Sequence, residues 1–326
     1  MPDFTDDPTP PSDLETLLGT PGFGDSSISS DIDGIAGRLP SLGEVVGVTV
    51  AGPVIMNAVG VHDAPRPLGG PLCVGAEQIS LRLNPSRLSS MLQTDPVAQV
   101  PPTLRLFDSL GNTAHATYLT ENSDRLAFES LLAFDPVSLS TSVPAGHGPG
   151  TASESASPGA AFLGPEFIPA ALPGRHDTDQ IGLFDSILRD GGTSRLRSLS
   201  QATGPSGLRV DTRRVTASLE HAALLGMTVT VAAAAPGCMQ MCQDRLDGAR
   251  EHRGQMVLAS GSTRVMVNFN HVEQCWVTWS QGAWGPTAAV EIYDRRSRCC
   301  LVVTLTGAVT RAAYEAWDHL TGDLTS

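Results

Sequence analysis

The chain has 326 residues, 41% of them hydrophobic, and a formal net charge of −13 at pH 7. This length allows one large domain or two medium ones, each able to bury a core. The negative charge argues against a nucleic acid or an anionic membrane as partner, because phosphate groups are bound by clustered basic residues.

Nothing in the sequence predicts a membrane span or a secretory signal. No run approaches the roughly 18 apolar residues of a span, and residues 1–15 are acidic where a signal peptide is basic and then apolar. We therefore expect a cytoplasmic protein. Cys238 and Cys242 share one face of a predicted strand about 13 Å apart, too far for one zinc ion. We interpret them as buried thiols and predict no metal site.

The first predicted elements follow an acidic, Pro-rich segment, residues 1–11, that we expect to be disordered. Ser12 to Glu15 form a capping-box pattern that opens a short helix ending near Gly19, and residues 32–39 predict a second helix. From Leu42 to Met56, alternating valines predict a strand with a turn at residues 51–53. Residues 79–83 predict another strand.

Two segments of the chain occur twice. Residues 104–134 align without a gap with residues 290–320, at an offset of 186, and both copies read strand, turn, strand, then a helix of the form Arg-x-Ala-[Phe/Tyr]-Glu. Residues 42–56 match residues 225–239 at an offset of 183, so the repeats differ internally by three residues. The chain is a tandem duplication. We predict an α+β fold of two repeats, each a large antiparallel β-sheet with flanking helices and the same strand order.

The duplication divides the chain into four parts. Ser, Gly, Pro and Ala dominate residues 137–158, which cannot bury enough apolar surface to offset their chain entropy. Removing about ten residues there is expected to change stability little. Helices are predicted at residues 178–189 and 215–225. The parts are 1–38, an acidic N-terminal tail with short helices; 39–136, the first repeat; 137–175, a low-complexity linker; and 176–326, the second repeat with its leading helices.

Three tryptophans lie close together on a predicted hairpin, in CWVTWSQGAW. We expect Trp276 in the core. Trp279 and Trp284 either pack on the hairpin or form the wall of a flat aromatic pocket. No Gly-x-Ser-x-Gly, P-loop or His-Glu-x-x-His motif is present.

Several segments together resemble the haemin-degrading HemS/ChuS/HmuS family, the tandem-repeat relatives of ChuX, in order and approximate spacing. They are LPSLGEVVGVT (39–49), ISLRL (79–83), LFDSLGNTAHATYLTEN (106–122), PGCMQ (236–240), CWVT (275–278) and VEIYD (290–294). The resemblance implies stacked antiparallel sheets with helical pairs and a role in iron transport and haem utilisation. It also implies a cytoplasmic protein that receives haem from an uptake system and, in several members, opens the porphyrin oxidatively.

The resemblance also implies where haem would bind, and there the sequence departs from the family. The axial histidine of the family's Thr-Asp-x-His-x-Phe-Phe pattern corresponds to Ile181, which cannot coordinate iron. Tyr118 does match the family's Tyr-x-Thr-x-Asn pattern. The other pocket positions are occupied by non-matching residues: Ala51 to Pro53, Met56, Pro101, Trp279 with Ser280, Thr304 and Gly307.

Other residues are candidates for the missing ligand. His176 lies five positions before Ile181 and is either a replacement ligand or an exposed loop residue. His271 is either a ligand or a structural residue, and Met56 either a thioether ligand or a core residue. The haem-pocket candidates are His176, His271, Met56, Tyr118 and Trp279.

Three functions therefore stay open from the sequence. The chain is a haem-handling protein, carrier or enzyme, with a displaced ligand; a non-catalytic paralogue that acts as a binding or interaction module; or a binder of another flat tetrapyrrole or hydrophobic ligand with Trp279 and Trp284 as its wall. The expected partners are haem or a related tetrapyrrole, components of a haem-uptake system, or a second copy of the chain.

Overall fold

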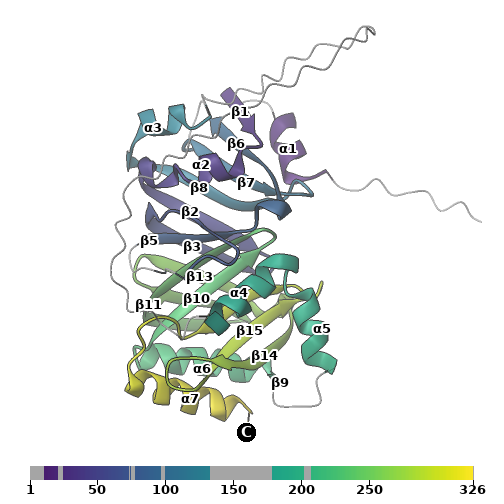
Figure 1. Ribbon diagram of the computed structural model, residues 1–326, viewed down its shortest axis with the longest axis vertical. Coiled ribbons are helices and arrows are strands. Elements are labelled where there is room, and N and C mark those ends of the chain that lie inside the picture. Colours follow the sequence, from purple (N-terminus) through teal and green to yellow (C-terminus); the bar gives the residue numbers. More distant parts are fainter. Residues whose placement is uncertain are drawn as a thin grey trace, which may run out of the picture.

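The computed structural model describes residues 11–20, 25–72, 74, 78–96, 100–132, 178–201 and 207–325. The linker at residues 137–175 lies outside the described residues, and so does the predicted disordered segment except for Pro11. Long strands form the centre of the molecule and helices lie around them, so the α+β prediction is confirmed (Figure 1). None of the helices in these ranges has the length and apolar composition needed to cross a membrane.

Short helices with polar caps begin the described chain, in the predicted N-terminal tail, and the first repeat follows them. Ser12 and Glu15 form the predicted capping box at the first helix. Asp124 caps the last helix by accepting a hydrogen bond from the Ala127 N–H. The elements are α1 (Asp13–Gly19), β1 (Asp25–Ser29), α2 (Ile32–Ala36), the 3₁₀ helix η1 (Leu39–Leu42), β2 (Gly43–Ala51), β3 (Val54–His62), β4 (Arg66–Pro67), β5 (Gln78–Leu83), the 3₁₀ helix η2 (Pro85–Arg87), β6 (Leu88–Asp95), β7 (Thr103–Asp108), β8 (Thr113–Ser123) and α3 (Arg125–Ser130).

The second repeat has a similar series of elements with longer helices; two helices precede its first strand where α1 alone precedes β1. Asp211 caps one of these helices at the Arg213 N–H. The elements are α4 (Thr178–Asp190), α5 (Thr193–Gln201), β9 (Gly207–Val210), α6 (Thr212–Leu224), β10 (Thr228–Ala235), β11 (Cys238–His252), β12 (Gln255–Ser260), β13 (Thr263–Asn268), the 3₁₀ helix η3 (Phe269–His271), β14 (Val272–Gln281), β15 (Pro286–Asp294), β16 (Cys299–Thr304) and α7 (Arg311–Thr325).

The two repeats share one strand order, as the duplication predicts. Neighbouring strands run β1-β6-β7-β8-β2-β3 in the first repeat and β9-β14-β15-β16-β10-β11 in the second. Both repeats end in a helix that begins with an Arg–Glu ion pair four residues apart: Arg125 with Glu129 in α3, and Arg311 with Glu315 in α7.

One strand of each repeat also pairs with a strand of the other repeat, which the sequence analysis did not predict. Strand β13 pairs with β3, where Val267 is opposite Val54. Strand β5 pairs with β11, where Leu83 is opposite Cys238. These two contacts are equivalent under the duplication. The sheets are therefore joined into one 16-stranded structure.

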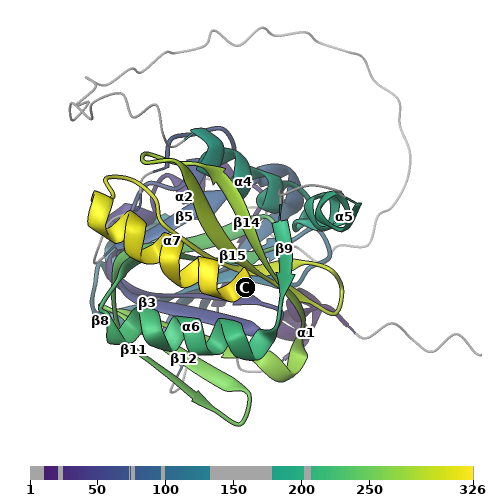
Figure 2. The same ribbon diagram turned by 90° about the horizontal axis from the view of Figure 1, so that it is seen from below.

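The centre of the second sheet is buried on both faces, as shown by β10, in which every residue after Thr228 is buried. On one face, Val229, Val231 and Ala233 of β10 belong to the main core, which also contains the apolar sides of α6 and α7. Figure 2 shows these two helices side by side. On the other face, Ala232 and Ala234 pack in a second core with α4 and α5.

Candidate ligand-binding site

Helix α4 carries Ile181, the residue that the sequence resemblance aligns with the family's axial histidine, and a buried ion pair fixes this helix to the first repeat. The Nε atom of Arg82, on β5, donates to Oδ1 of Asp185 at 2.6 Å, and the Gly69 N–H donates to Oδ2 at 2.8 Å. Arg82 is 1% exposed and Asp185 8%. The sequence analysis missed this pair. The only signal was a charged residue inside the apolar strand ISLRL.

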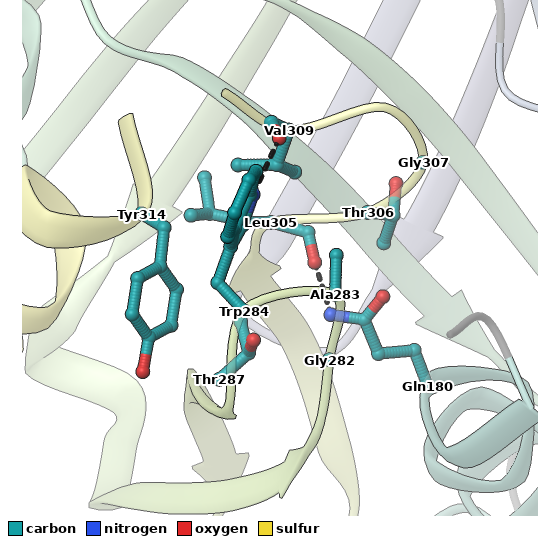
Figure 3. A pocket seen from close by; sticks show the side chains of 10 residues that line it. All are labelled: Gln180, Gly282, Ala283, Trp284, Thr287, Leu305, Thr306, Gly307, Val309 and Tyr314. Atoms are coloured by element: carbon teal, nitrogen blue, oxygen red, sulfur yellow. Dashed lines mark hydrogen bonds between the residues drawn. The ribbon is translucent and has the colours of Figure 1, made fainter. Parts of the chain in front are cut away.

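A small cavity lies beside the first described turn of α4, and we call it the α4 pocket (Figure 3). Its volume of about 10 Å³ is close to the minimum that holds one water molecule. A tetrapyrrole does not fit unless the surrounding side chains move. The lining residues are Gln180, Gly282, Ala283, Trp284, Thr287, Leu305, Thr306, Gly307, Val309 and Tyr314.

Two side chains close the α4 pocket by donating to backbone carbonyls. Nε2 of Gln180 donates to the Leu305 carbonyl, and Nε1 of Trp284 donates to the Val309 carbonyl at 2.8 Å (Figure 3). The hydroxyl of Tyr314 is also engaged, since it donates to the Pro286 carbonyl at 3.2 Å. These bonds tie the hairpin loop 282–285, the loop 305–309 and α4 together.

The residues present in the α4 pocket do not fit haem. Ile181 is half-buried on α4, next in sequence to Gln180 of the pocket but not itself a lining residue, and has no lone pair for iron. The pocket residues named above include no His, Cys, Met, Arg or Lys, so they offer no imidazole or sulfur ligand and no cation for a propionate. Thr304 is buried and donates to the Ala288 carbonyl at 2.9 Å. The described lining of the α4 pocket therefore offers haem no imidazole and no cation.

The five haem-pocket candidates do not lie in one site. Met56 is fully buried in the main core. Tyr118 is half-buried on β8, with the guanidinium of Arg105 5.7 Å from its ring centre. Trp279 and His271 line two separate hollows. His176 lies outside the described residues.

The hairpin tryptophans also separate. Trp276 is 8% exposed and packs in the second core, as expected. Trp284 is 50% exposed at the α4 pocket, whereas Trp279 lines a hollow of about 520 Å³ beside α5. They form no common aromatic wall. The free thiols of Cys238 and Cys242 are buried, which confirms the interpretation of the sequence.

A buried carboxylate network lies beneath α5, next to the hollow that contains Trp279. Glu291 on β15 is fully buried and accepts hydrogen bonds from three side chains. Nη2 of Arg195 donates to it at 2.7 Å and the hydroxyl of Tyr293 at 2.6 Å. The third donor is the hydroxyl of Thr278, at 2.5 Å. Burial raises the pKa of Tyr293 above its ordinary value. The network fixes α5 on the sheet, because Arg195 lies on α5 and Glu291 on β15.

A hollow of about 530 Å³ lies where three turns from both repeats meet, and we call it the corner pocket. The turns are the β2–β3 turn, the 3₁₀ helix η3 and the β15–β16 turn. Here His271 is exposed and lies close to a group of arginines that the sequence analysis did not single out. The lining residues are Val50, Gly52, Pro53, Ile55, Asn268, His271, Asp294, Arg295, Arg296 and Arg298.

Duplicated α+β repeats that exchange strands, with a helical pair on the second sheet, define the structural class of this chain. Solved structures of that class match it along almost its whole length. Apo-PhuS, a haem-binding protein from Pseudomonas aeruginosa, matches with a TM-score of 0.67 and 18% identity over 93% of this chain and 87% of PhuS. For holo-PhuS the TM-score is 0.69 at 16% identity, with the same coverage.

The haem-degrading enzyme ChuS of Escherichia coli O157:H7 matches with a TM-score of 0.68 and 18% identity, over 93% of this chain and 87% of ChuS. No family model matches the sequence, and no curated protein does. The chain therefore has the fold of the haem-binding and haem-degrading proteins PhuS and ChuS, as the sequence resemblance implies.

Proposed function

We propose that this protein binds haem and acts as a haem carrier in iron utilisation, without opening the porphyrin ring. The observation that carries the proposal is the match to holo-PhuS across both repeats. The same fold occurs in apo-PhuS and in ChuS. This chain therefore has the scaffold on which PhuS binds haem and ChuS degrades it.

The α4 pocket argues against ring opening at that position. Ring opening there would need an axial ligand for haem and room for oxygen beside the ring. The residues that line the α4 pocket supply no imidazole or sulfur ligand, and the pocket has room for about one water molecule. Binding alone needs less: an apolar surface for the ring and cations for the propionates.

Titration of the purified protein with haem, followed by absorbance, tests the proposal. We expect a Soret shift that saturates at one haem per chain, and no loss of the haem spectrum when a reductant and oxygen are added. A linear, non-saturating absorbance change would refute haem binding. Conversion of the bound haem to a ring-opened product would refute the carrier function.

Ile181→His tests whether the α4 pocket is the haem site. Because the cavity is filled, the new imidazole alone is expected to leave haem affinity unchanged. Ile181→His combined with Trp284→Ala, which removes the side chain that closes the pocket, is the matched variant in which a new His-ligated spectrum can appear. A large gain in affinity from Ile181→His alone would show that haem already enters this pocket.

A further inference from the structure

The duplication gives the molecule two equivalent corners, and only one of them is covered by a described helix. In the covered corner, Asn84 Nδ2 donates to the Leu188 carbonyl at 3.3 Å, and Arg87 Nη1 donates to the Arg189 carbonyl at 3.2 Å. Both carbonyls lie near the end of α4. The end of α4 thus covers this corner and is held there by Asn84 and Arg87.

In the other corner, the equivalent residues are Asn268 and His271, 184 positions later in the chain. No described helix covers them. The imidazole of His271 is exposed and has no hydrogen-bond partner among the described residues. The corner pocket is therefore open, whereas the end of α4 covers the equivalent position beside Asn84 and Arg87.

The floor of the corner pocket is apolar. Val50, Pro53 and Ile55 line it, and Val50 and Ile55 are directly paired across β2 and β3. The same row continues over the next strands, because Ile55 pairs with Met266 and Met266 with Val257. These four aliphatic side chains are 37–45% exposed. Val50 and Ile55 of this row line the corner pocket itself, so its floor offers adjoining apolar side chains to a flat apolar ligand.

The rim of the corner pocket is cationic although the chain as a whole carries −13. Arg298 is paired with Asp294 at 3.0 Å, and Arg295 donates to the Asn270 carbonyl at 3.2 Å. The guanidinium of Arg296 is exposed and has no partner in the part of the chain that the structure describes. A local positive site on an acidic protein attracts an anionic ligand.

We propose that the corner pocket is the haem site of this protein, an inference that rests on the proposed function. The apolar floor accepts the face of the porphyrin, Arg296 pairs with a propionate, and the imidazole of His271 coordinates the iron. A flat apolar ring that carries two carboxylates and a metal matches these three features together. This places the axial ligand on η3 of the second repeat, away from α4.

Three variants and two probes separate the contributions of metal and carboxylate. His271→Ala is expected to weaken haem binding by at least about tenfold and to shift the Soret band, since it removes the iron ligand. The same variant should leave the affinity for metal-free protoporphyrin IX unchanged. Arg296→Ala should weaken both probes by roughly two- to fivefold, as expected for an exposed ion pair; Arg296→Lys, which keeps the charge, should restore most of that loss.

His319→Ala, an exposed histidine on α7, is the matched control and should behave as wild type. All the substituted residues are exposed, so the variants are expected to fold, which circular dichroism checks. If wild type saturates with one haem but His271→Ala keeps its affinity and Soret position, this inference is overturned and the proposed function stands. Absence of saturable haem binding by wild type overturns the proposed function itself.

Discussion

Glu291 is a fully buried carboxylate with three side-chain donors, which makes its loss costly. Glu291→Ala leaves the guanidinium of Arg195 and the hydroxyls of Thr278 and Tyr293 without their common acceptor. We expect a loss of about 3–5 kcal/mol in the free energy of unfolding, measured by urea denaturation. Glu273→Ala, an exposed glutamate on β14, should change it by less than about 0.5 kcal/mol. Equal effects of the two variants would contradict the structural role of the network.

His62 and His115 form a second buried polar group, and they predict how stability depends on pH. Their ring centres are 5.5 Å apart, and both rings are buried. Nε2 of His62 bonds to the Thr117 hydroxyl at 3.0 Å and Nδ1 of His115 to the Thr49 hydroxyl at 2.9 Å. Burial lowers the pKa of His62 to about 4 and that of His115 well below its ordinary value.

As the pH falls, the unfolded chain therefore binds these protons at a higher pH than the folded chain does. Stability is at its full value above the unfolded pKa of about 6.5. It falls as the pH drops from there toward 4, by about 1.4 kcal/mol per pH unit for each histidine. His62→Gln should make the slope between pH 6.5 and 5 shallower in urea titrations at several pH values. His319→Gln should not; an unchanged slope in the His62 variant would show that the histidines do not carry the effect.

At the candidate site, the sequence could predict some of the residues and not others. The sequence named His271 as a candidate ligand, and the resemblance placed Ile181 where the family has its axial histidine. It did not identify Arg296, because the β15–β16 turn meets the β2–β3 turn only after the chain has folded across both repeats. Nor did it show that Gln180 and Trp284 close the α4 pocket, since both bond to backbone carbonyls, which leave no sequence pattern.

At the scale of elements, α4 is held by an ion pair that joins the two repeats, and this predicts a local effect. Asp185→Ala leaves Arg82 buried without its carboxylate, at a cost of about 3–5 kcal/mol. Hydrogen exchange should then become faster in α4 than in α6, because α6 packs in the other core. Asp318→Ala, at an exposed position on α7, is the control and should leave both rates unchanged. Uniformly faster exchange in all helices would argue against a specific role in docking α4.

Most elements could be predicted from local signals, and their pairing could not. The capping box at Ser12, the alternation of residues 42–56 and the helical spacing in α4 each report local backbone preference. Strand β5 was predicted for the same reason. Its partner was not, because Leu81 and Leu83 alternate in the same way whether the strand pairs within its own repeat or with β11.

At the scale of the whole molecule, the strand exchange predicts that neither repeat folds as an independent monomer. Without the second repeat, the edge of β3 from Val54 to Ala58 loses its partner β13, and β5 loses β11. Unpaired apolar edges lead to aggregation or to pairing with another chain. Residues 11–140 and 175–326 expressed separately should therefore be aggregated, or self-associated through exchange of β5 or β13 between copies.

Co-expression of the two fragments should restore a one-to-one complex, because the exchanged strands supply each edge with its partner without a covalent linker. Size-exclusion chromatography with light scattering gives the stoichiometry, and the near-ultraviolet circular dichroism of the complex should match that of the intact chain. The results expected for separate expression and for co-expression both follow from the same two strand pairs, β3–β13 and β5–β11. A fragment that stays monomeric and unfolds cooperatively on its own would show that these pairs are dispensable and that each repeat is a complete domain.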